Sequence, residues 1–282
     1  IVATPITDNI VALGYNTTSQ SGVDSLFVYK EDGTQLYSTN PDYFSWRLAI
    51  DASSRVYATD GDTTKRFNSS GGYEAQMITP AGFQTRSMAF KQNQTLFQFQ
   101  NMSAPFDFNN PLYDRFAAYN RAFGLISESM THNEVSSVDH IDISYEAGDG
   151  SRIFAAAQSV WTGATSGSVR VYTTVGDIVA LQYATFTYDN TVYGPTGTSD
   201  DTFAVAVSED GSRYAHVEYI DNVSNNFRVV VRDGASHAVI AAFTEAGAYS
   251  TWEGFAPVTS LGSRPAGVDF DRDNNILILC ND

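Results

Sequence analysis

The chain has 282 residues, of which 43% are hydrophobic, 13% aromatic and 17% charged, and its formal net charge is -16. This acidic balance argues against nucleic acid and against an anionic membrane surface as partners, because both require a basic protein surface. The single cysteine, Cys280, excludes an intramolecular disulfide, and no apolar run reaches the roughly 18 residues that a membrane span needs.

Short β-strands follow one another along the whole chain. Alternating apolar and polar residues mark the strands, and Asp-Gly, Ser-Gly and Asn-Asn pairs mark the turns between them. The predicted strands are, in chain order, Ile10–Tyr15, Ser25–Tyr29, Gln35–Ser38, Trp46–Ile50, Arg55–Thr59, Thr64–Phe67, Tyr73–Ile78, Arg86–Phe90, Thr95–Gln100, Asp114–Tyr119, Phe123–Ser127, Ile141–Tyr145, Arg152–Ala157, Ser168–Thr173, Ile178–Ala184, Phe203–Val207, Arg213–Tyr219, Phe227–Arg232, Ala238–Thr244, Gly267–Phe270 and Ile276–Cys280. Pro111–Phe123 is alternatively compatible with a helical turn.

One strand–turn–strand phrase recurs through the sequence. Its clearest copy covers Phe203–Phe243, and related copies begin at Ser25, Ser45 and Asp142; the last, Ala266–Cys280, stops after its second strand. Repeats of about 40 to 60 residues with about four short strands each are typical of a β-propeller. We therefore predict an all-β fold, a single β-propeller domain over residues 1–282, built from four-stranded antiparallel meanders and closed by pairing of the N- and C-terminal strands. Four complete units and a split one indicate six blades, with five or seven as alternatives.

The connections between strands alternate in length. In each meander, the turns from the first to the second strand and from the third to the fourth strand are short. The connections from the second to the third strand and from the fourth strand to the next meander are long, for example Tyr188–Asp201 and Glu245–Ser263. Because successive strands run in opposite directions, the long connections fall on one face, where long loops are usually functional. Aromatic rings among Asn, Ser and Thr suit carbohydrate or protein recognition; alternatively, they fill gaps between blades. The candidate binding residues are Tyr43, Phe44, Phe106, Phe108, Tyr113, Trp161, Tyr188, Tyr193, Trp252 and Phe255.

Closely spaced oxygen ligands near the C-terminus indicate a candidate calcium site. The segment DFDRDNN supplies Asp269, Asp271, Asp273 and Asn275, and a hard cation such as calcium prefers such ligands. The alternative is a hairpin whose Asp side chains accept hydrogen bonds from nearby backbone amides. No nucleophile elbow, phosphate-binding glycine loop or paired-histidine motif is present, so the sequence favours a non-enzymatic function.

Two segments resemble a known class of propeller repeat. Gly148–Asp177 (GDGSRIFAAAQSVWTGATSGSVRVYTTVGD) and Ser21–Thr39 are similar to the FG-GAP-like repeats of virion and tail proteins of marine tailed phages. AGVDFDRDNNILIL, at Ala266–Leu279, is similar to both the FG-GAP-like and the NHL-like types. The metal-bearing Asp-x-Asp-x-Asp-Gly loop of that family is matched only in part, by the three aspartates named above, and the other repeats lack it.

The resemblance implies a non-enzymatic virion structural component, located in a tail or fibre, that serves host-surface attachment or assembly. Its partners would be other virion subunits in an oligomeric assembly and a host-surface glycan or protein, with no cofactor except, on the partial loop match, calcium. One alternative is a secreted or cell-surface bacterial propeller that binds glycan or protein. Another is a metal-dependent enzyme that resembles the gluconolactonase-like propellers, which predicts carboxylates and amides converging at one mouth of the axis.

Overall fold

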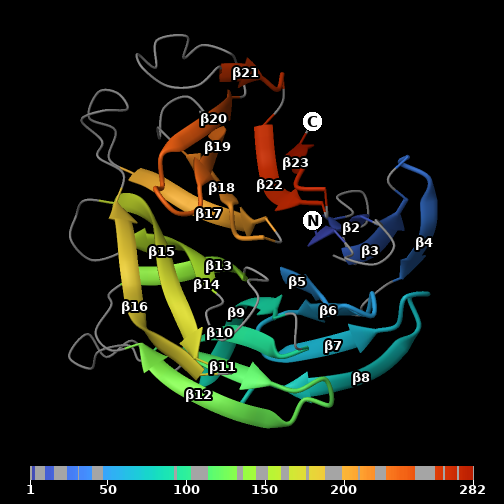
Figure 1. The fold of residues 1–282 in the computed structure, drawn as a ribbon. Helices are drawn as coiled ribbons and strands as arrows, with labels where there is room; N and C mark the ends of the chain where they lie inside the picture. Colours follow the sequence, from blue (N-terminus) through green and yellow to red (C-terminus); the bar gives the residue numbers. More distant parts are fainter. Residues whose placement is uncertain are drawn as a thin grey trace. The chain divides into compact units, whose positions relative to one another are not determined.

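The computed structural model describes two compact units, Ile1–Glu134 (unit 1) and Val135–Asp282 (unit 2). The described residues are 2–3, 10–15, 24–30, 32–39, 47–91, 94–102, 114–131, 136–143, 152–159, 165–175, 178–187, 199–208, 210–219, 227–244, 258–262, 264–271 and 273–281. Both units are built from β-sheets (Figure 1). Within the described ranges, no helix is long and apolar enough to cross a membrane.

Unit 1 contains three four-stranded sheets in which the strands pair in chain order, always antiparallel. The strands are β1 (Val2–Ala3), β2 (Ile10–Tyr15), β3 (Asp24–Tyr29) and β4 (Gln35–Thr39); β5 (Arg47–Ile50), β6 (Val56–Thr59), β7 (Thr63–Phe67) and β8 (Tyr73–Ile78); and β9 (Phe83–Phe90), β10 (Leu96–Met102), β11 (Asp114–Tyr119) and β12 (Leu125–Thr131). Each is a meander of the predicted kind.

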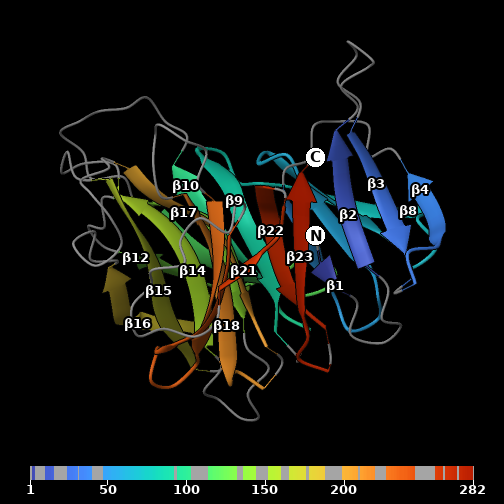
Figure 2. The ribbon, with the colours of Figure 1, turned by 90° about the horizontal axis from the view of Figure 1, so that it is seen from above.

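Unit 2 repeats this arrangement and adds two short parallel pairings. Its antiparallel strands are β13 (Ser136–Ile143), β14 (Arg152–Ser159), β15 (Thr165–Val175) and β16 (Ile178–Thr187); β17 (Ser199–Val207), β18 (Arg213–Tyr219), β19 (Phe227–Asp233) and β20 (Val239–Thr244); and the hairpin of β22 (Arg264–Phe270) and β23 (Ile276–Asn281), seen side by side in Figure 2. The parallel pairings join β15 to β17, and β20 to β21 (Val258–Ser260).

The all-β class and the antiparallel four-stranded meanders are confirmed. The predicted strand Tyr73–Ile78 is β8 without change, and Pro111–Phe123 contains strand β11 rather than a helical turn in its described part. The strand predicted at Phe123–Ser127 begins at Leu125 in the structure, two residues later than predicted. Phe123 has a φ of 65° and belongs to the preceding turn. The number of blades and the closure by terminal strands stay predictions.

A five-residue turn recurs at the hairpins. In each copy the N–H of the first residue donates to the carbonyl of the fifth, the N–H of the fourth donates to the carbonyl of the first, and the fourth residue has a positive φ. This is the geometry of a tight turn followed by a left-handed residue, which matches the twist of a hairpin. The copies are Lys30–Thr34, Asp51–Arg55, Asn68–Gly72, Lys91–Thr95, Asn120–Gly124 and Asp271–Asn275.

Where the first residue of this turn is Asp or Asn, its side chain stabilises the turn. Oδ1 then accepts hydrogen bonds from the N–H groups of the third and fifth residues, as an Asx turn does. The four such residues are Asp51, Asn68, Asn120 and Asp271. The same local chemistry therefore closes hairpins in both units.

We expect Gly71→Ala to destabilise the protein more than Gly82→Ala, although both glycines have a positive φ, of 82° and 88°. A left-handed backbone costs a residue with a Cβ roughly 1 kcal/mol. A Cβ at Gly82 meets nothing within 4 Å, whereas one at Gly71 would lie 2.5 Å from Cε2 of Tyr37. The crowded ring should add about 1 kcal/mol. Urea unfolding of the two variants measures the difference, and equal midpoints would contradict the contact between Tyr37 and this turn.

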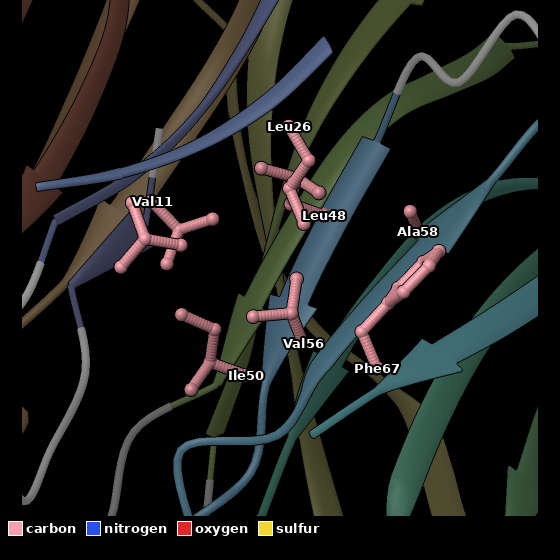
Figure 3. Packing of buried hydrophobic residues seen from close by; sticks show 8 residues of the cluster. Val11, Leu26, Leu48, Ile50, Val56, Ala58 and Phe67 are labelled. Carbon is pink, nitrogen blue, oxygen red and sulfur yellow. The ribbon is translucent and has the colours of Figure 1, made fainter. Parts of the chain in front are cut away.

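In the middle sheet of unit 1, β5–β8, the strands β5 and β6 are buried on both faces. Alternate side chains of β5 and β6 enter two different hydrophobic clusters, as the period of a strand requires. The cluster in Figure 3 consists of Val11, Leu26, Val28, Leu48, Ile50, Val56, Ala58 and Phe67. The other cluster consists of Ala49, Tyr57, Met77, Met88, Phe90, Leu96, Ala117 and Tyr119. β5–β8 is therefore packed between the first and third sheets.

A buried hydrogen-bond network also connects β5–β8 to β9–β12. Gln98 lies at its centre: its Nε2 donates to Thr64 Oγ1 (3.0 Å), and its Oε1 accepts from Thr85 Oγ1 (3.0 Å) and Gln100 Nε2 (2.8 Å). All four side chains have 0% exposure. Gln100 Oε1 accepts in turn from Arg115 Nε (2.9 Å). Buried polar groups need such partners, so the network ties the two sheets in one register.

Candidate functional site

The ten predicted aromatic binding residues lie outside the described residues. They are Tyr43, Phe44, Phe106, Phe108, Tyr113, Trp161, Tyr188, Tyr193, Trp252 and Phe255. Recognition by the long connections therefore stays a prediction.

The described residues of the DFDRDNN segment form the end of β22 and the turn that leads to β23. Asp271 Oδ1 accepts the N–H groups of Asp273 (2.9 Å) and Asn275 (2.7 Å), and its Oδ2 accepts from Asn275 Nδ2 (2.9 Å). Asp269 precedes the turn and accepts the N–H of Phe270 (2.8 Å). These local bonds are those of the alternative hairpin interpretation. In the part of the chain that is described, no three His, Cys, Asp or Glu side chains are grouped to hold a metal ion. Calcium binding stays a prediction.

Large apolar side chains are exposed on β4, β8 and β12, which are end strands of their sheets, and on β20, which pairs with β19 and β21. On β8, Tyr73 is 58% exposed and Ile78 is 73% exposed. β8 and β12 are the end strands of their sheets in unit 1 (Figure 1). The exposed large hydrophobic residues of the described chain are Leu36 on β4, Tyr73 and Ile78 on β8, Leu125 and Ile126 on β12, and Ile240 on β20. An end strand also presents unpaired backbone N–H and C=O groups, so these edges are suited to a protein partner.

Ion pairs neutralise the acidic residues of β8 and β12. Glu74 Oε2 lies 2.8 Å from Arg66 Nε and 3.2 Å from Arg55 Nε. Glu128 Oε2 lies 2.6 Å from Arg115 Nη1. In a chain with a net charge of -16, these edges therefore combine exposed apolar side chains with carboxylates that already have partners. Less charge then has to be desolvated when another protein covers them.

A second candidate site lies in unit 2, where Asp142 and Asp269 interact. Asp142 is close to the end of β13, Asp269 is close to the end of β22, and β17 packs against both strands. Asp142 Oδ2 accepts the N–H of Val207 (2.7 Å) and its Oδ1 that of Ile143 (2.8 Å). Burial, followed by the negative charge of Asp269, raises the pKa of Asp142 to about 8, although the two N–H groups act in the opposite direction. The direction of this shift favours the protonated form of Asp142.

The positions of these two aspartates are equivalent in the repeat. Each is the last residue but one of the first strand of its sheet. The corresponding residues of β5, β9 and β17 are Ala49, Ala89 and Ala206, and all three are buried. Sequence reasoning interpreted Asp269 only through its neighbours in the chain and did not select Asp142. Aligning the repeats would have shown two acids at a position that is a buried alanine in β5, β9 and β17.

His216 is another strongly perturbed titratable group in the described part of unit 2. It is buried on β18, and its Nε2 accepts a hydrogen bond from Arg232 Nε (3.2 Å). Burial and then the charges of Arg232 and Arg228 hold the pKa of His216 well below its usual range. The neutral imidazole is thus part of the packing of β18 and β19 and not a free acid or base at pH 7.

Comparisons with known proteins identify the fold. No family model and no curated protein matches the sequence. Among solved structures, the chain is similar to the WD40 domain of Neurospora crassa Pan2, with 9% identity, 92% of this chain and 68% of that chain covered, and a TM-score of 0.52. It is also similar to the β-propeller domain of Myceliophteria thermophila Cps50 (Swd1), with 8% identity, coverage of 98% and 95%, and a TM-score of 0.52. These likenesses support a β-propeller fold, as predicted, and carry no function.

Proposed function

We propose that this chain is a non-enzymatic structural component of a virion tail or fibre, which packs through the end strands of its sheets against other protein subunits. The observation that carries the proposal is the exposed apolar surface of β8 and β12, where the acidic residues already have partners. Large apolar side chains on the end strand of a sheet are suited to contact with another protein, since the strand also offers unpaired backbone groups.

A protein subunit is the partner that suits these edges. An antiparallel end strand offers a row of backbone donors and acceptors at a fixed spacing, and a second strand or loop can bond to them while its side chains cover the apolar ones. The resemblance of Gly148–Asp177 and Ser21–Thr39 to repeats of tailed-phage proteins is the reason for placing the assembly in a virion. Host attachment would use the aromatic residues of the long connections, and many copies on one particle would convert weak sites into avidity.

Replacing Ile78 with glutamate tests the packing of β8. We expect Ile78→Glu to lower the number of copies incorporated per particle at least tenfold, because burying an isoleucine contributes roughly 1.5–3 kcal/mol and a buried unpaired carboxylate opposes association further. Gln76→Glu is the matched control, since Gln76 is exposed on the same strand. Quantitative mass spectrometry of purified particles measures the copy number.

The folding of both variants should match that of the natural chain, because Ile78 is 73% exposed and makes little core contact. Normal incorporation of Ile78→Glu would refute the role of β8 in assembly. If the natural chain is absent from purified particles and instead binds glycan or protein as a secreted module, the virion assignment is wrong and the secreted alternative replaces it.

A further inference from the structure

The hairpin of β22 and β23 carries an inference that goes beyond the proposed function and does not depend on it. We propose that the edge of β23 pairs antiparallel with β23 of a second copy of this chain, so that two hairpins related by a two-fold axis make one four-stranded sheet. Ile278 lies at the axis, and Ile276 of each copy lies opposite Cys280 of the other copy.

The sheet of β22 and β23 is half the size of the sheets in unit 1. It has two strands in the described part of the chain, whereas the sheets β1–β4, β5–β8 and β9–β12 each have four. In β5–β8 the second strand, β6, pairs antiparallel with β5 on one side and with β7 on the other. β23 follows β22 through the same five-residue turn, but among the described strands it pairs with β22 alone. A strand that runs antiparallel to β23 would therefore complete the repeat.

The side chains of β23 are less buried than those of other second strands. Val56–Thr59 of β6 are all buried, whereas Ile276–Cys280 of β23 are all half-buried. Ile276 and Ile278 pack in part against a hydrophobic cluster formed by β17, β18, β19 and β22. An apolar run on an unpaired edge is a ready template for another strand, and that strand would cover what remains exposed.

The turn before β23 determines which backbone groups face its edge. The N–H of Asp271 donates to the carbonyl of Asn275 (3.0 Å), and bonded pairs alternate with non-bonded pairs along an antiparallel ladder. Every second residue of β23 therefore bonds to β22, beginning with Leu277. The irregularity between Pro265 and Gly267 lies in β22 and leaves this alternation along β23 unchanged. The residues whose N–H and C=O groups point to the edge are Ile276, Ile278 and Cys280.

These residues are self-complementary about a two-fold axis. When Ile278 lies opposite Ile278 of the second copy, Ile276 lies opposite Cys280, and each pair exchanges two backbone hydrogen bonds. The side chains of these pairs share one face of the sheet, and those of Leu277 and Leu279 share the other. β23 has no charged side chain, so neither copy brings a like charge to the contact in a chain whose net charge is -16.

The first test compares Ile278→Pro with Ile278→Ala by analytical ultracentrifugation of the purified chain. Both variants shorten the side chain, but only proline removes the N–H at the centre of the contact, and an edge strand tolerates proline. We expect the natural chain and Ile278→Ala to dimerise, and Ile278→Pro to dimerise at least about tenfold more weakly than Ile278→Ala. A natural chain that stays monomeric up to about 100 μM would overturn the proposal. Equal dimerisation of the two variants would also overturn it.

Cross-linking tests the register and does not require the proline variant to fold. Ile276→Cys places a thiol opposite Cys280 of the other copy, where the Cα atoms of a bonded pair are roughly 5.5 Å apart. A short bismaleimide should then give a covalent dimer on a denaturing gel. The two thiols of one chain lie four residues, or roughly 13 Å, apart along the strand and cannot produce this band.

Leu277→Cys is the matched control for the cross-link, because its thiol lies on the opposite face of the sheet and should give little dimer. Equal yields from the two cysteine variants would contradict the register. Ile78→Glu, which tests β8 in unit 1, should leave the dimer intact, so the two contacts between subunits can fail separately. Loss of the dimer in Ile78→Glu would place the contact between copies on β8 and refute the role of β23.

Discussion

Gln98→Leu is expected to lower the free energy of unfolding by about 3 kcal/mol. Leucine has nearly the same size as glutamine but neither donates nor accepts. Thr64, Thr85 and Gln100 would each lose a hydrogen-bond partner in a place with no exposure. An unmet buried polar group costs about 1–3 kcal/mol, and part of this is recovered where Thr85 keeps its bond to Thr79 (3.1 Å).

Removing the stranded hydroxyls should restore part of the loss. In the triple variant Gln98→Leu with Thr64→Val and Thr85→Val, the two hydroxyl partners disappear together with the glutamine, and apolar side chains of similar shape fill the space. Gln76→Leu, on the exposed side of β8, is the control and should change stability by less than about 0.5 kcal/mol. Chemical unfolding at equilibrium measures all three. A triple variant weaker than Gln98→Leu alone would show that packing rather than hydrogen bonding sets the cost.

The hairpins could be predicted from the sequence because their turns are local. Asx turns such as that at Asp51 use side-chain and backbone groups within five residues, and Asp and Asn are readily recognised. The residue at which a turn ends and a strand begins is harder to predict where the left-handed position holds neither Gly nor Asn. Phe123 and Gln94 occupy it with φ of 65° and 75°, so the strand following Phe123 was predicted too early.

Non-local pairings could not be predicted in the same way. β21 was missed because its three residues pair in parallel with β20, and that pairing leaves no pattern in a segment so short. The interaction of Asp142 with Asp269 joins residues in the first and last sheets of unit 2. The local sequence predicts a hairpin at Asp269 and an ordinary strand at Asp142. Only the fold, through β17, brings the two carboxyl groups together.

Asp51→Ala is expected to cost about 3 kcal/mol, and Asp51→Asn only about 1 kcal/mol, because Asp51 has two separable roles. Its Oδ1 caps the turn by accepting from the N–H of Ser53 (2.8 Å) and of Arg55 (3.0 Å). Its Oδ2 is buried and lies 3.6 Å from Arg55 Nη1 and 3.4 Å from Arg121 Nε. Alanine removes both roles, whereas asparagine removes only the charge.

The chain itself contains the precedent for asparagine in this position. Asn68 and Asn120 begin the same five-residue turn and make the same pair of Oδ1 bonds. Asp51→Asn should therefore keep the turn, and its remaining cost reports the ion pairs with the half-buried arginines. Equilibrium unfolding separates the two variants, and an equal loss in both would mean that the turn contributes nothing beyond the charge.

Tyr57 supplies a second measurement at the same place. Its hydroxyl donates to Asp51 Oδ2 (3.4 Å), and burial, followed by the negative charge of Asp51, raises the pKa of Tyr57 to about 12. Both replacements remove that charge, so both should lower the pKa of Tyr57, as ultraviolet titration of the phenol can follow. Asp51→Ala should therefore lose more stability than Asp51→Asn, whereas the pKa of Tyr57 should fall by a similar amount in both variants. The first difference measures the contribution of Asp51 to the turn, and the shared fall in pKa measures the contribution of its charge.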